Sequence, residues 1–455
     1  MNLSKILGFL TATFLLFASS SCNKILDMHP QDKLQDEEIY TSIRNYEQAV
    51  LGVYAELQTE YNILIGSIFA DEAKLANDNM GVNGYASNLH RWNYASDDDV
   101  LLMAWKNAYA SIYKINLLLS NSERVQRSGS AEEAKLNHLV AELKALRSFI
   151  HFGLHQIYGD FNPGAGNYTV PYVTTVDIHQ KPPKLPTAEF YTQAEQDIVE
   201  ALASGTGQSD LGRFSDDAIH AYAARFYLYQ KKYKEAIKHA TPLITKYKLA
   251  EGEHYATLWQ DIRNTELILA FKRNNNNEIR PNTLWRNYSS GKTLFHPSHK
   301  ILNYLEQEEG DRYALFEENE EEAPVGKYPG NTYADNLNDV KAFRVSELYL
   351  ILAEAYFFEN RPTESSDMLA TLQQARGIDS PKTVASIDDI LGERFAELCF
   401  EGHRYFDLKR LGKTLERNTE DLALTTDKKQ LLSTDPNYRL PIPFKETQIN
   451  PDLKW

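Results

Sequence analysis

The chain has 455 residues, of which 42% are hydrophobic, so it can bury the core of one large helical domain or of two or three average domains. It carries 63 acidic residues against 48 basic ones, a formal net charge of −15, and no basic stripe is visible. This balance disfavours a nucleic-acid partner, because phosphate binding needs clustered positive charge. The cysteines are Cys22 and Cys399, and they leave no disulfide once the N-terminus is processed, so stability must come from the core.

Residues 1–21 have the pattern of a secretory signal. The apolar run 6–18 follows a positive charge and is too short to span a bilayer. Three serines then lead directly to Cys22, a pattern similar to a bacterial lipobox, although Ser19 stands where leucine is commoner. We predict that Cys22 carries the lipid anchor, which holds the protein at a membrane without spanning it. The alternative is an ordinary signal peptide that leaves Cys22 free.

Apolar residues spaced three and four apart predict a series of helix pairs along the rest of the chain. In the third and fourth pairs, small and aromatic residues stand where tetratricopeptide helices need them for close packing. We expect an all-α, tetratricopeptide-like solenoid of helix pairs with large irregular loop insertions. The expected pairs occupy residues 44–119, 131–203, 217–248 and 344–377.

Two groups of polar residues have both a metal-binding and a structural interpretation. Residues 97–99 are three aspartates at the predicted start of a helix, where carboxylates satisfy free N–H groups and the helix dipole. His151 and His155 lie four apart, as a metal pair would, but no third ligand of suitable spacing follows. We therefore predict helix capping at the aspartates, and no metal or cofactor.

Two irregular stretches combine aromatic rings with amides and guanidinium groups, residues 71–94 and 279–296. A sugar ring can stack on an aromatic face while its hydroxyls bind amide, carboxylate and guanidinium groups. Long loops in a compact domain are often functional, so we predict that both stretches contribute to one ligand site. The alternative for each aromatic is packing of its loop onto the helices. The predicted ligand-binding residues are Asp71, Asn79, Tyr85, Arg91, Trp92, Trp285 and Tyr288.

Catalytic motifs are missing from the sequence. It contains no glycine-rich phosphate loop, no G-x-S-x-G, no H-E-x-x-H and no cysteine cluster. Paired carboxylates for glycoside hydrolysis exist in principle among 63 acidic residues, but no local motif singles out a pair. We therefore predict no catalytic residues and a binding protein rather than an enzyme.

The segment 393–413, ERFAELCFEGHRYFDLKRLGK, is predicted to form one helix with an apolar stripe that runs to Lys409. Beside the stripe, a row at three-residue steps alternates in charge, so that neighbours can pair along the helix. Gly402 in a helix interior costs about 1 kcal/mol relative to alanine. Close approach of another backbone is one reason to accept that cost. The charged row consists of Glu401, Arg404, Asp407 and Arg410.

This segment resembles the C-terminal hallmark of the SusD/RagB family of outer-membrane nutrient-binding lipoproteins, ER-x-x-EL-x-FEG-x-R-x-FDL-x-R. Further matches are the W-x-x-x-Y-x-x-I-x-x-x-N run at 105–116, the stretch 145–160 and the closing segment 440–451. The resemblance covers essentially the whole mature chain, which we expect to be a single SusD-like domain over residues 22–455.

The resemblance implies a lipid-anchored protein on the cell surface, at the outer membrane. It would bind glycan or oligosaccharide nutrients and deliver them to a SusC-like TonB-dependent β-barrel transporter. The RagB branch of the family implies a variant that binds peptides instead. Two other classes stay open from the residues alone: a secreted glycosidase, and a tetratricopeptide scaffold that binds only protein.

Overall fold

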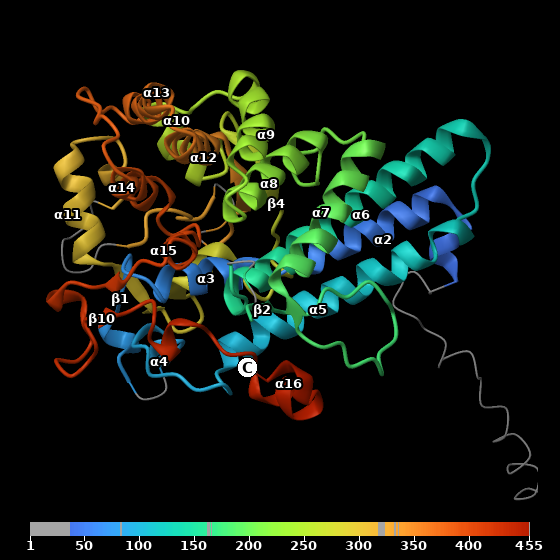
Figure 1. Cartoon of the computed structure of the whole chain (residues 1–455), viewed down its shortest axis with the longest axis horizontal. Helices are drawn as coiled ribbons and strands as arrows, with labels where there is room; N and C mark the ends of the chain where they lie inside the picture. The colour runs from blue at the N-terminus through green and yellow to red at the C-terminus, as the bar shows by residue number, and fades with distance from the viewer. Residues whose placement is uncertain are drawn as a thin grey trace, which may run out of the picture.

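Helices make up most of the molecule, and its strands are short (Figure 1). The computed structural model describes residues 37–81, 84–161, 164, 166–316, 324–331, 334 and 336–454. The predicted signal segment 1–21 and Cys22 lie outside these residues. Within them, each strand pairs with one other strand in an antiparallel two-stranded sheet. The predicted all-α class is confirmed.

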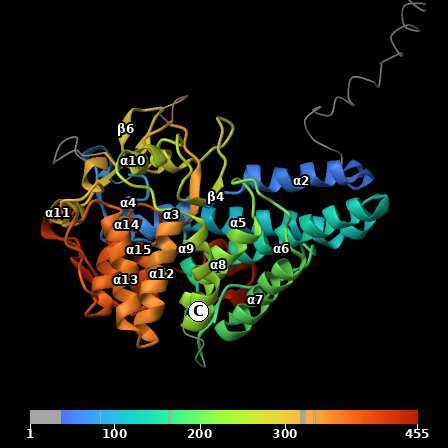
Figure 2. The ribbon, with the colours of Figure 1, turned by 90° about the horizontal axis from the view of Figure 1, so that it is seen from above.

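The predicted helix pairs are present as packed neighbours. They are α2 (Ile43–Glu56) with α5 (Asp99–Ser120), α6 (Gly129–Tyr158) with α7 (Thr187–Ser204), α8 (Asp216–Tyr229) with α9 (Tyr233–Lys246), and α12 (Val345–Phe358) with α13 (Pro362–Gln374). Neighbouring pairs also touch, through α5 and α6, α7 and α8, and α9 and α12. In Figures 1 and 2, α2, α5, α6 and α7 extend together on one side, while α12 and α13 lie on the other.

Local sequence explains where these helices begin and how closely they pack. Asp98 caps α5, because its carboxylate accepts hydrogen bonds from the backbone N–H groups of Val100 at 2.9 Å and Leu101 at 3.3 Å. The predicted capping role is confirmed for Asp98. Between α12 and α13, the buried Ser365 hydroxyl donates to the Ala353 carbonyl at 2.7 Å. Such a contact is possible only where small side chains let the two helices approach.

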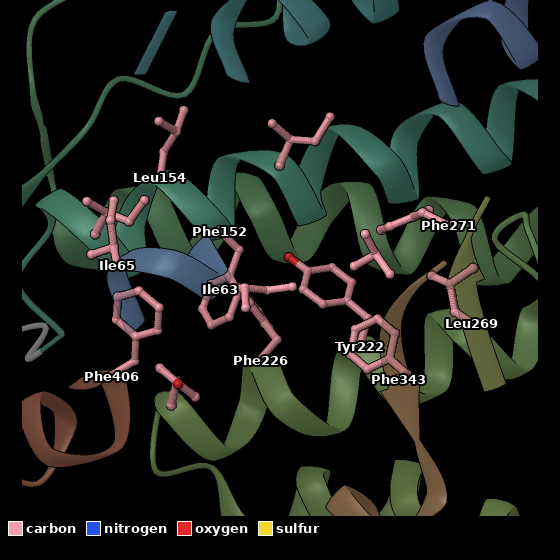
Figure 3. Packing of buried hydrophobic residues seen from close by; sticks show 14 of the residues in the cluster. Ile63, Ile65, Phe152, Leu154, Tyr222, Phe226, Leu269, Phe271, Phe343 and Phe406 are labelled. Carbon is pink, nitrogen blue, oxygen red and sulfur yellow. The ribbon is translucent and has the colours of Figure 1, made fainter. Parts of the chain in front are cut away.

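Aromatic side chains fill the centre, where the helix pairs meet a two-stranded sheet (Figure 3). The sheet joins β4 (Leu267–Phe271) to β8 (Val340–Arg344). Phe152 of α6 lies 5.5 Å from Phe226 of α8, ring centre to ring centre, in an edge-on arrangement. Edge-on pairs add about 0.5–1.5 kcal/mol each beyond simple burial. The aromatic residues of the sequence are therefore used largely for packing.

Shorter elements surround this core. The remaining helices are α3 (Glu60–Ile68), α4 (Ser87–His90), α10 (Glu253–Trp259), α11 (His299–Glu308), α14 (Ile387–Leu398), α15 (Arg404–Arg410) and α16 (Phe444–Ile449). The remaining strand pairs are β1 (Ala73–Leu75) with β7 (Phe295–Pro297), β2 (Tyr168–Thr169) with β3 (Leu185–Pro186), β5 (Arg286–Asn287) with β6 (Lys292–Thr293), and β9 (Leu415–Glu416) with β10 (Gln430–Leu431).

The prediction of one helix over 393–413 is wrong. Helix α14 ends at Leu398, the chain turns, and α15 begins at Arg404. In the turn, Phe400 and Gly402 have left-handed φ angles of 60° and 81°. The predicted close approach at Gly402 is confirmed, because a Cβ added there would lie 2.6 Å from the Cα of Ile63 in α3. Gly402 therefore serves both the turn and the contact with α3.

Most charged residues of this segment pair with residues of other elements rather than with neighbours on the same helix. Asp407 and Arg410 pair as predicted, at 2.9 Å. Glu401 instead binds Arg344 of β8 and Lys327, both at 2.7 Å. The predicted row fails because the turn separates Glu401 from α15, so its carboxylate faces other elements.

A buried ion network lies behind this turn. The Glu397 carboxylate accepts hydrogen bonds from Arg376 at 2.9 Å and from Arg344 at 3.0 Å. Glu266 contacts the same two arginines, at 2.9 Å and 2.5 Å. Burial would raise the pKa of Glu397, but the two guanidinium groups outweigh it and hold the pKa below its ordinary value. The carboxylate is therefore charged in the folded protein at neutral pH.

The α3 contact gives a stability prediction. Gly66→Ala places a Cβ 2.3 Å from the backbone oxygen of Gly402. Because neither backbone is free to move, we expect the free energy of unfolding in urea to fall by about 3 kcal/mol. Gly52→Ala is the matched control, since Gly52 lies in α2 with no atom within 4 Å of its added Cβ. This control should be stabilised by up to about 1 kcal/mol. Equal effects of the two changes would contradict the close approach.

Candidate functional site

A cleft of about 390 Å³ opens where three segments distant in sequence meet. They are the segment from β1 to Met80, the segment from β6 to the start of α11, and the segment 420–423. We call it the β1–β7 cleft. Among the described residues, its lining contains both basic and acidic side chains but no Trp, Tyr or Phe. The lining residues are Lys74, Leu75, Ala76, Asn77, Asp78, Met80, Thr293, His296, His299, Glu420, Asp421, Leu422 and Ala423.

The β1–β7 pairing positions one wall of the cleft. Leu75 pairs with Phe295, and both are buried, so the strands are anchored to the core on that face. Because side chains alternate along a strand, the intervening pair of Lys74 and His296 turns the other way, toward the cleft. Cross-strand neighbours lie side by side. This wall therefore presents two nitrogen-bearing side chains together.

His299 is held in place by a buried carboxylate. Its Nδ1 lies 2.8 Å from Asp421 Oδ1, and its backbone N–H donates to the same oxygen at 2.6 Å. Nδ1 therefore carries the proton it donates, which leaves Nε2 as an acceptor 3.3 Å from the Lys74 ammonium. Asp421 thus fixes the ring orientation and, through it, the position of the lysine.

A second buried ion cluster joins elements that border the cleft. The Arg404 guanidinium binds both oxygens of Asp71, at 2.7 Å and 2.9 Å, and Lys300 donates to it at 2.6 Å. Burial would raise the pKa of Asp71, but these two cations outweigh it and hold the pKa well below its usual range. The cluster connects the start of α15 to α11 and to Asp71, two residues before β1.

Arg417 is a buried cation that binds carbonyl groups. Its guanidinium donates to the carbonyls of Ile68 and Ala70, both at 2.9 Å, and of His90 at 2.6 Å. It also lies 4.1 Å from the ring centre of Trp92. Burial lowers the pKa of Arg417 to about 9, so the group is still charged at neutral pH. A positive charge at the C-terminal end of α3 is favourable for the helix dipole, and here it fixes the direction in which the chain enters β1.

The structure places the two predicted tryptophans in the core, and their predicted stacking role is wrong. Trp92 is 3% exposed, and its indole N–H donates to the Phe69 carbonyl at 2.8 Å. Trp285 is 4% exposed, with its ring centre 5.2 Å from that of Phe400. Neither ring has a free face for a ligand. The alternative, loop packing onto the helices, is the observed arrangement for both.

Asp71 and Asn79 are also buried, so burial contradicts a direct ligand contact for either side chain. The Asn79 amide donates to the carbonyls of Tyr85 at 2.9 Å and Leu294 at 3.1 Å. It therefore joins the first predicted loop to the second. The two stretches do meet, but through a structural amide and not through facing aromatic rings.

The other predicted site residues lie nearer the surface. Tyr85 is 38% exposed. Arg91 binds the Asp427 carboxylate with two nitrogens, at 2.8 Å and 2.9 Å. Tyr288 is partly buried, and the Arg286 guanidinium lies 5.6 Å from the centre of the Tyr288 ring. None of the three is among the residues that line the β1–β7 cleft. Their role in ligand binding stays a prediction.

Several lining residues were not predicted from the sequence. Lys74, His296 and His299 belong to or adjoin the predicted loops, but an isolated histidine or lysine carries little signal. Glu420 and Asp421 come from a C-terminal segment with no distinctive composition. The one usable signal was the Ser298–His299 pair, since Ser298 caps α11 by accepting from the Ile301 N–H at 3.2 Å. A residue at a helix start is well placed to face a cleft.

The two histidines with metal-pair spacing are bound to other groups. His151 lies 2.9 Å from the Arg147 carbonyl and accepts from the Val173 N–H at 2.9 Å. His155 lies between the hydroxyls of Thr169 and Tyr191. Across the described parts of the chain, no group of three or more His, Cys, Asp and Glu is arranged to hold a metal. Nor does any helix there have the length and apolarity to cross a bilayer.

The architecture is that of a tetratricopeptide-like helical scaffold whose insertions form a cleft, and comparison with known proteins agrees with it. The model of a family described as "SusD family" matches residues 188–454, and one described as "Starch-binding associating with outer membrane" matches residues 24–228. The chain belongs to the SusD family.

Similar proteins cover nearly the whole chain at low identity. SusD-like protein P25 of Formosa agariphila is 23% identical over 99% of this chain and 98% of its own length. A SusD superfamily crystal structure from Bacteroides thetaiotaomicron has a TM-score of 0.81 at 23% identity, covering 90% of this chain and 99% of that one. A structure described as a laminarin-binding SusD-like protein has a TM-score of 0.68 at 19% identity, covering 90% and 98%. The structural likenesses establish the fold.

The Asp71 cluster gives a pH-dependent prediction. Asp71→Asn should lower the free energy of unfolding at neutral pH by about 3–5 kcal/mol, because Arg404 and Lys300 lose their buried counter-charge. The folded-state pKa of Asp71 is below its unfolded value, so its stabilisation is present above that unfolded value and is lost as the pH falls. The difference between wild type and variant should therefore shrink from about pH 7 to about pH 3 in urea titrations.

Glu133→Gln is the control for this experiment. Glu133 forms an exposed pair with Arg127, and such pairs contribute about 0–1 kcal/mol. A similarly small loss for Asp71→Asn, or a loss that grows toward low pH, would show that the cluster does not stabilise the fold.

Proposed function

We propose that this protein is a cell-surface lipoprotein that binds oligosaccharide in the β1–β7 cleft and delivers it to a SusC-like TonB-dependent outer-membrane transporter. Family membership supports the class, and the laminarin-binding relative supports a glycan as the ligand. The proposal includes a signal peptide over residues 1–21 and a single SusD-like domain over 22–455. The ligand is held and passed on without being cleaved.

The observation that carries the proposal is the mixture of groups around one cleft. Sugar hydroxyls both donate and accept, so a site for them needs donors and acceptors in one place. The cleft offers Lys74 and His296 as nitrogen groups and the exposed carboxylates of Asp78 and Glu420 as acceptors. Met80, which is 39% exposed, adds an apolar surface for the C–H face of a ring.

The side chains that line the cleft also distinguish a binding protein from a glycosidase. A glycosidase needs a carboxyl pair at a defined separation, with one pKa raised so that it acts as an acid. Of the three carboxylates that line the cleft, Asp421 is bound to His299 and to the start of α11, and Asp78 and Glu420 are exposed rather than held in a buried pair. We therefore propose binding without hydrolysis. Peptide binding of the RagB type differs only in ligand, and the following experiment separates the two.

Calorimetry with laminari-oligosaccharides, malto-oligosaccharides and a set of tetrapeptides tests the ligand class. We expect saturable binding of at least one oligosaccharide and no sugar fragments by chromatography after incubation. The double variant Asp78→Ala with Glu420→Ala should weaken that binding about tenfold or more, since it removes two hydrogen-bond acceptors of the cleft. The matched control is Glu235→Ala with Glu364→Ala, which removes two exposed carboxylates from α9 and α13.

The outcomes of this experiment distinguish the ligand classes and the proposed site. Peptide binding without sugar binding would show that the ligand is a peptide and not a glycan. Release of shorter sugars would make the protein an enzyme. Equal affinity of the two double variants would move the site away from the β1–β7 cleft.

Cell fractionation tests the anchor and the partner. The wild-type protein should be recovered with the outer membrane, and Cys22→Ser should move it to the soluble fraction because the acylated thiol is lost. Cys399→Ala is the control, since that thiol is buried in the fold and should not affect location.

A tagged wild-type protein extracted in mild detergent should bring down a β-barrel protein. Retention of the Cys22→Ser variant at the membrane would contradict lipid anchoring at Cys22. A pull-down that contains no β-barrel protein would contradict the proposed partnership with a transporter.

A further inference from the structure

A groove of about 290 Å³ runs between α5, the segment 171–182 and the C-terminal segment 446–453, which begins in α16. We call it the α5–α16 groove, and Figure 1 shows α16 below α5 on that side of the molecule. It shares no lining residue with the β1–β7 cleft, among the residues that the structure describes. The proposed glycan site therefore leaves this groove unused.

Large apolar side chains are exposed around this groove. Tyr113 of α5 is 41% exposed, Ile178 is 74% exposed, and Ile449 of α16 is 61% exposed. They belong to three separate elements, so the fold itself brings them together at one place. Single apolar residues are normal on a protein surface, but an apolar patch of this kind marks a binding surface.

The lining of the groove also carries charge. Asp177 and Lys181 are exposed, and Glu446 is half-buried. Within the described ranges of the chain, none of these three side chains forms an ion pair. An occupant that fits this groove is therefore mainly apolar and carries both a positive and a negative group beside its apolar part.

The chain enters the fold within reach of the groove. The described residues begin at Glu37, whose carboxylate binds Arg124 at 3.0 Å. Tyr113 precedes Arg124 by 11 residues, mostly within α5, so the two lie roughly 17 Å apart along the helix axis. When extended, residues 31–36 can span about 20 Å. The residues just before them can therefore lie in the groove.

The sequence of those residues matches the groove. In an extended backbone, alternate side chains share one face. Leu26, Met28 and Pro30 therefore form an apolar row, and a proline favours extended backbone in the residue before it. Lys24 begins the same row, and Asp27 lies on the opposite face. The segment thus offers an apolar face with one positive and one negative group beside it.

We infer that residues 24–30 dock in the α5–α16 groove as an extended segment, with their apolar row against its exposed apolar side chains. Lys24 meets the carboxylates of the groove, and Asp27 meets Lys181. One residue then separates the docked segment from Cys22, so this face of the molecule is turned toward the membrane. This last consequence, unlike the docking itself, rests on the proposed lipid anchor.

Disulfide formation in the full-length protein tests the docking. Under mild oxidation, Met28→Cys with Ile178→Cys should form a disulfide at least about tenfold faster than Met28→Cys with Leu51→Cys, because docking raises the effective concentration of the two thiols. Leu51 is the matched partner, since it is 43% exposed and lies in α2, the first α-helix after Glu37. All variants also carry Cys22→Ser, so that lipidation has no part in the result. Peptide mass spectrometry identifies the disulfides.

A change in the groove gives the second readout. Ile449→Asp should slow the disulfide of the first pair about tenfold, because it removes apolar surface and adds a like charge near the carboxylates. Val199→Asp is its control, since Val199 is 51% exposed on α7 and lies outside the groove. This control should leave the rate unchanged.

Three results would overturn the docking. They are equal rates for the two cysteine pairs, an equal effect of Ile449→Asp and Val199→Asp, and disulfides that join two copies of the chain instead of forming within one. The cell fractionation described above tests the anchor separately. Its failure would remove the membrane orientation but would leave the docking result in place.

Discussion

The packing of the C-terminal half depends on the buried carboxylate of Glu397, which is shared between Arg344 and Arg376. Each of these charges costs several kcal/mol to remove from water, and only mutual pairing with good geometry offsets that cost. The three residues come from α14, from the end of β8 and from just after α13. A shift of any one segment would leave a charge buried without a partner, so the network permits one relative arrangement of these elements. Non-polar packing alone would tolerate small displacements more easily.

The β1–β7 cleft depends on this arrangement through a short series of contacts. The network fixes α14, and the turn after it brings Gly402 against α3 and sends Arg404 to Asp71. Arg417 holds the other end of α3 by its carbonyls. Since α3 leads into β1 through Asp71, two buried arginines fix the chain just before it enters the cleft wall. The hallmark segment thus acts from outside the cleft: its charged residues position the loops, and none of them lines the cleft.

Periodicity in the sequence was sufficient to predict the helix pairs, because an amphipathic helix and its small-residue contacts are local properties. It could not predict the break after Leu398. The spacing of apolar residues continues through the turn, and what ends the helix is the contact between Gly402 and α3, more than 300 residues earlier in the chain. The tryptophans illustrate the same limit. Trp92 and Trp285 stand in loops rich in Asn and Arg, as ligand-binding aromatics do, yet burial against Phe69 and Phe400 decides their role. Two of the cleft carboxylates, Glu420 and Asp421, come from a third segment, and no local pattern connects it to the other two.

The seven residues of α15 connect the start of β1 to the end of α6. Its first residue, Arg404, binds Asp71 just before β1, and Lys409 near its end donates to the carbonyls of Gln156 and Ile157. Between them, Asp407 binds Arg394 of α14 at 2.8 Å and Arg410 at 2.9 Å, which fixes the rotation of the helix about its axis. A helix held in this way cannot turn Arg404 toward Asp71 without also turning Lys409 toward the end of α6. The position of the amine is therefore a consequence of the same buried charges that fix the chain before β1, and those charges hold the end of α6 through it.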